Sequence, residues 1–247
     1  RSGHMLFSHV VRVFGMGESE AEYRLRTLME RQSNPTIAPY ALSGEMKLRV
    51  TARCKSAEEG ERMMAPLIDE IKETLGSVVY SIDDQELHEV CAALLREHGA
   101  TLAVAESCTG GMIAARIINV PGVSECYKAG LVTYSNKAKR KFLGVRKSTL
   151  DKYGAVSSKT ASEMAKGAAL LMKSDVAVAV TGIAGPDGGT EEKPVGLVYI
   201  GCSVKGEVTV KEYHFSGTRS QIREASTSAA LILSLIHISE PTRRSYI

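Results

Sequence analysis

The first third of the chain alternates between strand-like and helix-like hydrophobic patterns. Residues 7–14 are rich in valine and phenylalanine and predict a strand. Hydrophobic side chains then recur at helical spacing to about residue 32, with Ser19 as the expected cap. Residues 46–54 alternate hydrophobic with polar, mostly basic, side chains, which predicts a half-buried strand paired with residues 36–42.

A second helix and a closing strand complete this pattern. Ser56 and Glu59 form a capping-box sequence that opens a helix to about Leu75. A strand follows at residues 78–82. The predicted order is therefore β-α-β-β-α-β, a small KH-like α+β domain over residues 6–83, with a turn at residues 43–44.

The pattern changes after Asp83 and Asp84, which are expected to cap a helix that ends near Gly99. Residues 175–180 are an uninterrupted apolar run, which is typical of a parallel strand buried on both faces. Other strands are expected at residues 101–106, 129–134, 195–202 and 208–215, and helices at 109–119, at 157–173 and from Thr218 onward. These elements predict a three-layer α/β/α sandwich whose mixed sheet ends in an antiparallel hairpin.

Composition narrows the classes of protein. The 247 residues are 44% hydrophobic and 24% charged, which is ordinary for a globular chain, and no apolar run has the length of a membrane helix. A net charge of +3 gives no electrostatic reason to expect nucleic acid as a partner. The five cysteines are scattered and odd in number, which favours reduced thiols in the cytoplasm and predicts no metal site.

Both ends of the chain are expected to be non-native. Residues 1–5 resemble the remnant of a cleaved purification tag, and residues 235–247 lose the helical periodicity before them. The second domain is accordingly predicted over residues 84–234.

The first candidate site is the loop that runs from Glu106 to Gly111. Ser107 follows a buried strand and precedes a helix, where backbone N–H groups are available to an oxyanion or a phosphate. The same position also suits a serine that merely caps the helix. The pattern alone leaves both interpretations open and slightly favours the cap.

The second candidate is the glycine-rich loop that starts at Thr181 and ends at Gly189. It matches neither the Walker A loop nor the dinucleotide fingerprint. Four glycines directly after a buried strand favour a ribose-phosphate cradle over a plain connection.

The third candidate is the basic stretch from Lys137 to Lys141, which follows Tyr134. Such a stretch is commonly a solvated helix face. Clustered cations also lower the pKa of a lysine, so that one lysine of the stretch is a candidate general base toward a serine, with Tyr134 a candidate proton relay.

Other chemistry finds less support. The histidines lie in no motif resembling G-x-S-x-G, and the acidic pairs 83–84 and 191–192 are better explained as cap and loop charges. Cys108 is a possible nucleophile, although an inert buried cysteine is commoner.

Five ordered motifs make the chain similar to a known family. They are Ala-Glu-Ser-Cys-Thr-Gly-Gly ending at Gly111, Thr-Tyr-Ser-Asn-Lys ending at Lys137, Gly-Ala-Val-Ser ending at Ser157, Val-Thr-Gly-Ile-Ala-Gly-Pro-Asp-Gly-Gly ending at Gly189, and Phe-Ser-Gly-Thr-Arg ending at Arg219. Together they resemble the carboxyl-terminal domain of the CinA family, which includes nicotinamide-nucleotide amidohydrolases of pyridine-nucleotide salvage. The preceding segment resembles the family's KH-like middle domain. No counterpart of its amino-terminal molybdopterin-binding-like domain is found, so the chain is expected to be a fragment.

The resemblance implies deamidation of nicotinamide mononucleotide to nicotinate mononucleotide and ammonia, without a metal or cofactor. It implies Ser107 as nucleophile, Lys137 as general base and Tyr134 as its assistant. The implied substrate contacts are Thr109, Gly110, Gly111, Thr181, Gly182 and Gly185, with the substrate phosphate on Arg219 or Arg223. Backbone N–H groups around residues 109–111 would stabilise the oxyanion. A cytoplasmic homodimer is expected, and the choice among mononucleotide, riboside and dinucleotide stays open.

Two other classes compete with the amidohydrolase. A nucleic-acid-binding KH module needs a GxxG loop, and none occurs in residues 6–83. A non-catalytic nucleotide- or partner-binding protein of DNA uptake or damage response needs no serine and lysine pair. That second class is the alternative to an enzyme.

Overall fold

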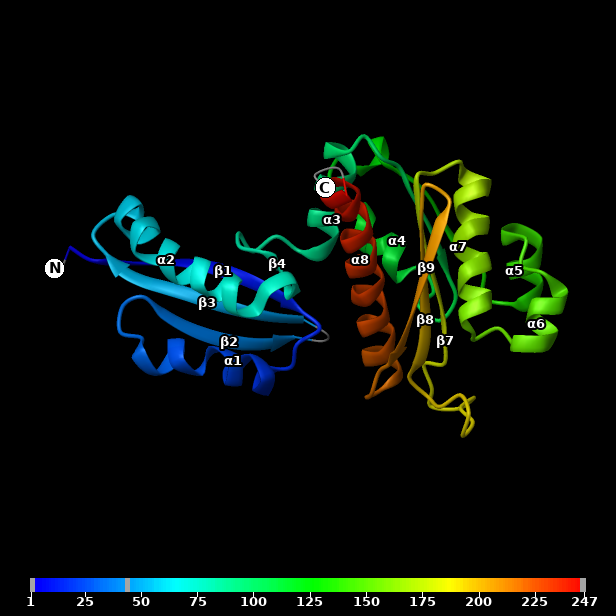
Figure 1. Cartoon of the computed structure of the whole chain (residues 1–247), viewed down its shortest axis with the longest axis horizontal. Helices are drawn as coiled ribbons and strands as arrows, with labels where there is room; N and C mark the ends of the chain where they lie inside the picture. Colours follow the sequence, from blue (N-terminus) through cyan, green and yellow to red (C-terminus); the bar gives the residue numbers. More distant parts are fainter. Residues whose placement is uncertain (1–2, 43–44, 245–247) are drawn as a thin grey trace. The chain divides into compact units, whose positions relative to one another are not determined.

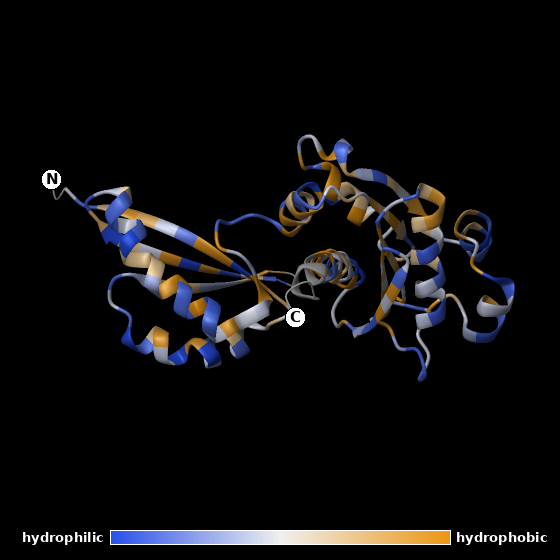
Figure 2. Cartoon of the chain, turned by 45° about the horizontal axis from the view of Figure 1, so that its top comes forward, coloured by the Kyte–Doolittle hydropathy of each residue, from blue (hydrophilic) through white to orange (hydrophobic). Residues whose placement is uncertain are grey.

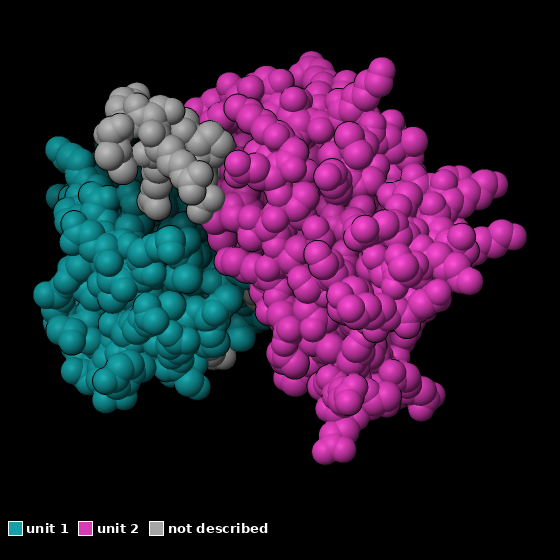
Figure 3. Space-filling view, turned by 45° about the vertical axis from the view of Figure 1, so that its right-hand side comes forward, with its two compact units in different colours: residues 1–86 teal, residues 87–247 magenta. Residues whose placement is uncertain are grey.

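The computed structural model of the chain describes residues 3–42 and 45–244, with the backbone alone at Glu18 and at 239–244. It divides into two compact units, unit 1 (residues 1–86) and unit 2 (residues 87–247), which Figure 3 colours separately. The sequence predicts this boundary three residues earlier, between residues 83 and 84. The turn expected at residues 43–44 lies outside the described residues.

Unit 1 is an α+β sandwich of one sheet and two helices. Its elements are β1 (Met5–Phe14), α1 (Glu18–Arg31), β2 (Thr36–Leu42), β3 (Glu45–Cys54), α2 (Ala57–Leu75), a 3₁₀ turn (Gly76–Val78) and β4 (Val79–Ser81). The sheet has the order β2-β3-β1-β4, and all of its strand pairs are antiparallel. The predicted β-α-β-β-α-β order is therefore confirmed.

Alternation along the strands places one face of this sheet in the core. Leu48 and Val50 of β3 are buried against helix residues such as Met64, while Arg49 between them is exposed. Figure 2 shows this alternation as hydrophobic and hydrophilic bands along the strands. The hydrophobic side chains thus fix which face of the sheet α1 and α2 cover.

Of two helix caps predicted in unit 1, one is confirmed and the other is wrong. The cap at Ser56 is confirmed, because its hydroxyl accepts a hydrogen bond from Glu59 N (3.2 Å). The Glu59 carboxylate accepts one from Lys55 N (2.6 Å), one residue before the N–H that a capping box uses. The cap at Ser19 is wrong, because α1 begins at Glu18 after Gly17.

The acidic pair at the end of unit 1 also differs from its prediction. Asp84 caps no helix. Its carboxylate lies 2.7 Å from the guanidinium of the buried Arg12 and 3.4 Å from Lys47. A buried arginine needs a carboxylate partner, and this pairing keeps residues 84–86 on unit 1.

Unit 2 is an α/β domain around a mixed five-stranded sheet. Its elements are α3 (Leu87–Glu97), β5 (Leu102–Glu106), α4 (Met112–Ile118), a 3₁₀ turn (Val123–Glu125), β6 (Tyr127–Val132), α5 (Asn136–Leu143), α6 (Lys147–Tyr153), α7 (Ser158–Met172), β7 (Val176–Gly182), β8 (Leu197–Val204), β9 (Glu207–His214) and α8 (Arg219–Arg244). The strand order is β6-β5-β7-β8-β9. β5 is parallel to β6 and β7, whereas β8 and β9 form the antiparallel edge. The predicted mixed sheet and its edge hairpin are confirmed.

Helices cover both faces of this sheet, as Figure 1 shows. α7 packs on β5, β7 and β8, with α5 and α6 on its outer side. α8 packs on β7 and β8 and contacts α3 and α4. The central strands β5 and β7 are consequently buried on both sides, and their carboxyl ends lie side by side.

Two segments of unit 2 differ from the sequence expectation. α6 was not predicted, because it is a single short helix with little hydrophobic repetition. The loss of helical structure expected from residue 235 onward is wrong, because α8 continues to Arg244 and both Leu235 and Ile238 are buried. A non-native origin of the tail stays a prediction.

Candidate active site

Ser107 lies at the carboxyl edge of the sheet in unit 2. It directly follows β5, and its N–H donates to the carbonyl of Val180 in β7 (3.0 Å). Ser107 is 8% exposed, so a small part of its surface is accessible to solvent. Open α/β sheets bind their ligands at this edge.

A buried carboxylate fixes the loop after Ser107. Glu106 is fully buried, and its two oxygens accept hydrogen bonds from the N–H groups of Gly111 (2.9 Å), Ile113 (3.1 Å) and Ala114 (2.9 Å). These are amides at the start of α4 that have no helical partner of their own. Glu106 therefore caps α4 in place of Ser107, and the serine hydroxyl is left for other contacts.

The Ser107 hydroxyl contacts a buried lysine. Lys139 Nζ donates to Ser107 Oγ (2.9 Å), to Thr133 O (2.8 Å) and to Tyr134 O (3.1 Å). Lys139 is 1% exposed. Burial lowers its pKa from the ordinary value of 10.5 to about 8, against a small opposing effect of Cys108.

The prediction of Lys137 as the partner of Ser107 is wrong. α5 begins at Asn136 after the cap Ser135, and residues two apart on a helix point to nearly opposite sides. Lys139 shares the buried side of α5 with Leu143, whereas Lys137 is exposed. The spacing of Lys139 and Leu143, four residues, was the sequence signal that could have identified the inward-facing lysine.

Lys137 belongs instead to an open basic groove. The groove has a volume of about 430 Å³ and is lined by Lys137, Arg140, Lys141, Val145, Arg146 and Lys147. It corresponds to the solvated helix face that was the alternative interpretation of this stretch.

Tyr134 contributes its backbone to the site. Its carbonyl accepts the hydrogen bond from Lys139, while its side chain is 62% exposed and its hydroxyl lies 3.4 Å from Arg219 Nη2. The role predicted for the hydroxyl, as a proton relay that assists Lys137 and Ser107, is therefore not supported by its contacts.

Few amides of the loop are available to an oxyanion. The N–H of Gly110 donates to Ser107 O (3.1 Å) and that of Gly111 to Glu106. Within the described ranges, the N–H groups of Cys108 and Thr109 donate to no oxygen atom, and both interact with the sulfur of Cys108. Of the oxyanion donors predicted at residues 109–111, the N–H groups of Gly110 and Gly111 are therefore already used by these contacts.

The two arginines of α8 have different surroundings. Arg223 is half-buried and donates through Nε to Cys108 O (2.9 Å) and through Nη2 to Thr109 O (3.0 Å). Arg219 is exposed and donates to Gly185 O (2.7 Å). The sequence leaves open which of the two arginines binds the substrate phosphate. Arg223 contacts the loop backbone, whereas Arg219 is exposed to solvent.

The glycine-rich loop after β7 is held by its own contacts. The hydroxyl of Thr181 is buried and donates to Ala155 O (2.8 Å), so its proton is not available to a substrate. A Cβ on Gly182 would lie 2.6 Å from a Val198 methyl, so this glycine permits close packing on β8. Gly185 has a φ of +74° and offers its carbonyl to Arg219.

Other candidate groups lie outside this arrangement. Cys108 is buried, which raises the pKa of its thiol to about 11 and disfavours the reactive thiolate. Among the described residues, no group of three or more His, Cys, Asp or Glu side chains is arranged to hold a metal ion. No helix in the same part of the chain is long and apolar enough to cross a membrane.

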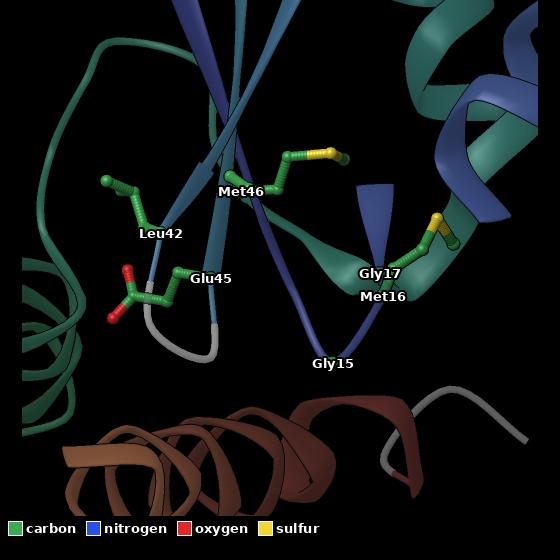
Figure 4. A pocket seen from close by; sticks show the side chains of 7 residues that line it. Gly15, Met16, Gly17, Leu42, Glu45 and Met46 are labelled. Atoms are coloured by element: carbon green, nitrogen blue, oxygen red, sulfur yellow. The ribbon is translucent and has the colours of Figure 1, made fainter. Parts of the chain in front are cut away.

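Unit 1 has a separate cavity of about 280 Å³, shown in Figure 4. It lies between the turn after β1 and the ends of β2 and β3, and its lining residues are Gly15, Met16, Gly17, Ala41, Leu42, Glu45 and Met46. The Glu45 carboxylate accepts a hydrogen bond from the Tyr80 hydroxyl (2.6 Å). The other lining side chains among the described residues are apolar or absent, so they offer no nucleophile.

Comparison with known proteins agrees with this division into two units. Residues 84–237 match the family model described as the CinA C-terminal domain, and residues 8–81 match the damage-inducible protein CinA KH domain. The chain belongs to the CinA family. The CinA C-terminal match includes Ser107, Lys139 and both arginines of α8.

Relatives within the CinA family are close in sequence. The chain is 49% identical to CinA-like proteins of Kosmotoga olearia, over 92% of the chain, and Dictyoglomus turgidum, over 94% of it. These matches cover 55% and 56% of the two relatives, so the chain spans about half the length of the curated CinA relatives it matches.

Solved structures of the CinA superfamily share the fold. A competence/damage inducible protein from Agrobacterium tumefaciens is 43% identical, with a TM-score of 0.60, over 62% of this chain and 93% of its own. A CinA superfamily protein from Escherichia coli is 34% identical, with a TM-score of 0.60, over 65% of this chain and 95% of its own.

Proposed function

We propose that the chain is an amidohydrolase that converts nicotinamide mononucleotide to nicotinate mononucleotide and ammonia. Membership of the CinA family suggests the substrate, because the family includes nicotinamide-nucleotide amidohydrolases. The observation that carries the proposal is the buried contact of 2.9 Å between Lys139 Nζ and Ser107 Oγ. A serine hydroxyl needs a nearby base to act as a nucleophile, and this lysine has a lowered pKa.

The two carbonyls around Lys139 orient its lone pair. A neutral amine has two N–H donors and one lone pair. When the two donors bind Thr133 O and Tyr134 O, the lone pair faces the third partner, the Ser107 hydroxyl. The deprotonated form of Lys139 is therefore prepared to accept the serine proton.

The acylation step follows from this arrangement. Lys139 takes the proton of Ser107 while Oγ bonds to the carboxamide carbon, and the C=O electron pair moves to oxygen. The N–H groups of Cys108 and Thr109 stabilise this oxyanion, and a well-placed donor of this kind contributes about 3 kcal/mol. As the C–N bond breaks, the leaving nitrogen takes the proton from Lys139 and departs as ammonia.

Hydrolysis of the acyl ester repeats the same proton transfer. Water gives a proton to Lys139 as its oxygen bonds to the acyl carbon. When the C–O bond to Ser107 breaks, the serine oxygen takes that proton back and the carboxylic acid product is released. One amide and one water thus yield one carboxylate product and one ammonia, and Ser107 and Lys139 return to their starting forms.

Arg219 is the group we propose for the substrate phosphate. It is exposed on the first turn of α8, and it donates to Gly185 O (2.7 Å) of the glycine-rich loop. An arginine held from one side retains N–H donors for a phosphate on the other.

The proposed cellular setting follows the family and the thiols. The five described cysteines are buried and unpaired, which supports a reducing cytoplasm. A homodimer stays a prediction that sedimentation velocity tests.

Product analysis tests the proposal. Purified chain is incubated with nicotinamide mononucleotide in the presence of a chelator, and ammonia and nicotinate mononucleotide are both quantified. Equal amounts of the two products are expected, with none from Ser107→Ala and normal amounts from Ser148→Ala, an exposed serine on α6. Turnover that survives in Ser107→Ala would contradict the nucleophile, and a folded wild type without turnover would favour the non-catalytic alternative.

A further inference from the structure

We propose that Arg223 is a positioning residue that fixes the Thr109 N–H, one of the two proposed oxyanion donors in the loop after Ser107, and is not a ligand of the substrate phosphate. This inference rests on the proposed function. Arg223 donates to two consecutive carbonyls, from Nε to Cys108 O (2.9 Å) and from Nη2 to Thr109 O (3.0 Å). The guanidinium is a rigid plane, so these two contacts together set the direction of both carbonyls.

Peptide geometry carries this constraint to the N–H groups. In a trans peptide the C=O of one residue and the N–H of the next point in opposite directions. The Cys108 carbonyl points to Arg223 on α8, so the Thr109 N–H points away from α8. That N–H is one of the two loop amides that donate to no oxygen among the described residues.

The other contacts of the loop agree with a clamp around these amides. Glu106 holds the N–H of Gly111, and Ser107 O holds the N–H of Gly110. Glu106 thus binds donors at the end of the loop, while Arg223 binds acceptors in its middle. Between the two anchors, the N–H groups of Cys108 and Thr109 donate to no oxygen among the described residues and have only the weakly accepting sulfur of Cys108 as a partner.

Packing places the guanidinium directly against the loop. Gly110 has a φ of +59°, and a Cβ there would lie 3.3 Å from Arg223 Nη2. Arg223 is half-buried, whereas Arg219, one turn earlier on α8, is exposed. The two arginines therefore form a matched pair with separable roles.

Kinetics with two substrates separate these roles. Nicotinamide mononucleotide and nicotinamide riboside carry the same carboxamide, and only the first has a phosphate. Arg223→Lys keeps the charge but loses the planar fork, so kcat is expected to fall by about 10- to 100-fold on both substrates with little change in KM. Arg219→Lys is expected to raise KM for the mononucleotide alone, by about tenfold. The reverse pattern, with Arg223→Lys raising only the KM for the mononucleotide, would overturn the inference, as would unchanged kinetics.

A covalent probe gives a readout that needs no substrate. An alkyl fluorophosphonate bonds its phosphorus to Ser107 Oγ and loses fluoride, and its phosphoryl oxygen then occupies the oxyanion position. Intact-mass measurement is expected to show labelling slowed by about tenfold or more in Arg223→Lys and unchanged in Ser148→Ala, the exposed control on α6, at equal thermal stability. Equal labelling rates in Arg223→Lys and wild type would overturn the positioning role of Arg223.

The two readouts also distinguish failure of the clamp from failure of the proposed function. A wild type that is labelled but does not release ammonia would contradict the substrate, and the labelling rates would still decide the role of Arg223. A wild type that is neither labelled nor active would overturn both proposals, because Ser107 would then not be a nucleophile.

Discussion

The pH dependence of turnover tests the state of Lys139. Burial lowers its pKa to about 8, and the proposed chemistry needs the neutral amine. With that pKa, the neutral fraction is about 9% at pH 7 and about 91% at pH 9, so kcat/KM should rise about tenfold and then level off. A lysine with the ordinary pKa of 10.5 would instead give a rise of roughly 100-fold over the same range, without a plateau.

The assay is ammonia release at constant ionic strength from pH 6 to 10. Nicotinamide riboside serves as the control substrate, because it lacks the phosphate whose own ionisation near pH 6 affects binding. The expected profile has a single rise with a midpoint near pH 8 on both substrates. A rate that keeps climbing tenfold per pH unit above pH 9, or one that is flat from pH 7 to 9, would refute Lys139 as the base.

Three further substitutions test the support of the site. Glu106→Gln should lower the free energy of unfolding by about 2 kcal/mol and reduce kcat, because an amide replaces a carboxylate that accepts three backbone N–H groups. Thermal unfolding measures the change in stability, and Glu97→Gln, at an exposed position on α3, is the control. Gly167→Ala should destabilise by about 1–3 kcal/mol, because its Cβ would lie 1.9 Å from Leu143 O at the end of α5; an unchanged midpoint would contradict this packing. Cys108→Ala should retain most activity, since a buried thiol with a raised pKa is no nucleophile, and loss of turnover with normal stability would argue otherwise.

Hydrophobic patterning predicts much of this fold because it reports burial along each element. The uninterrupted run at residues 175–180 identified β7 as a strand covered on both faces, and alternation identified β3 in unit 1. Capping sequences gave the start of α2 correctly but misplaced the caps at Ser19 and Asp84. Asp84 illustrates the reason. Local sequence predicts that its carboxylate caps a helix, but the carboxylate instead pairs with the buried Arg12, which is distant in sequence.

The site could be predicted only as far as its local motifs reach. Ser107 was identifiable as a candidate because it follows a buried strand and precedes a helix, although the local pattern alone slightly favours a helix cap. The choice between Lys137 and Lys139 depends on where α5 begins, which a stretch of five residues with four cations does not reveal. Arg223 reaches Cys108 across 115 residues of sequence, so its contact depends on how α8 packs beside α4.

The most direct test compares the two lysines of α5 in the same ammonia-release assay. Lys139→Ala removes the group that contacts Ser107, whereas Lys137→Ala removes an exposed cation two residues earlier. The expected result is wild-type turnover in Lys137→Ala and a loss of about 100-fold or more in Lys139→Ala, with both variants folded. Turnover that survives in Lys139→Ala and is lost in Lys137→Ala would contradict the serine and lysine pair that the structure presents.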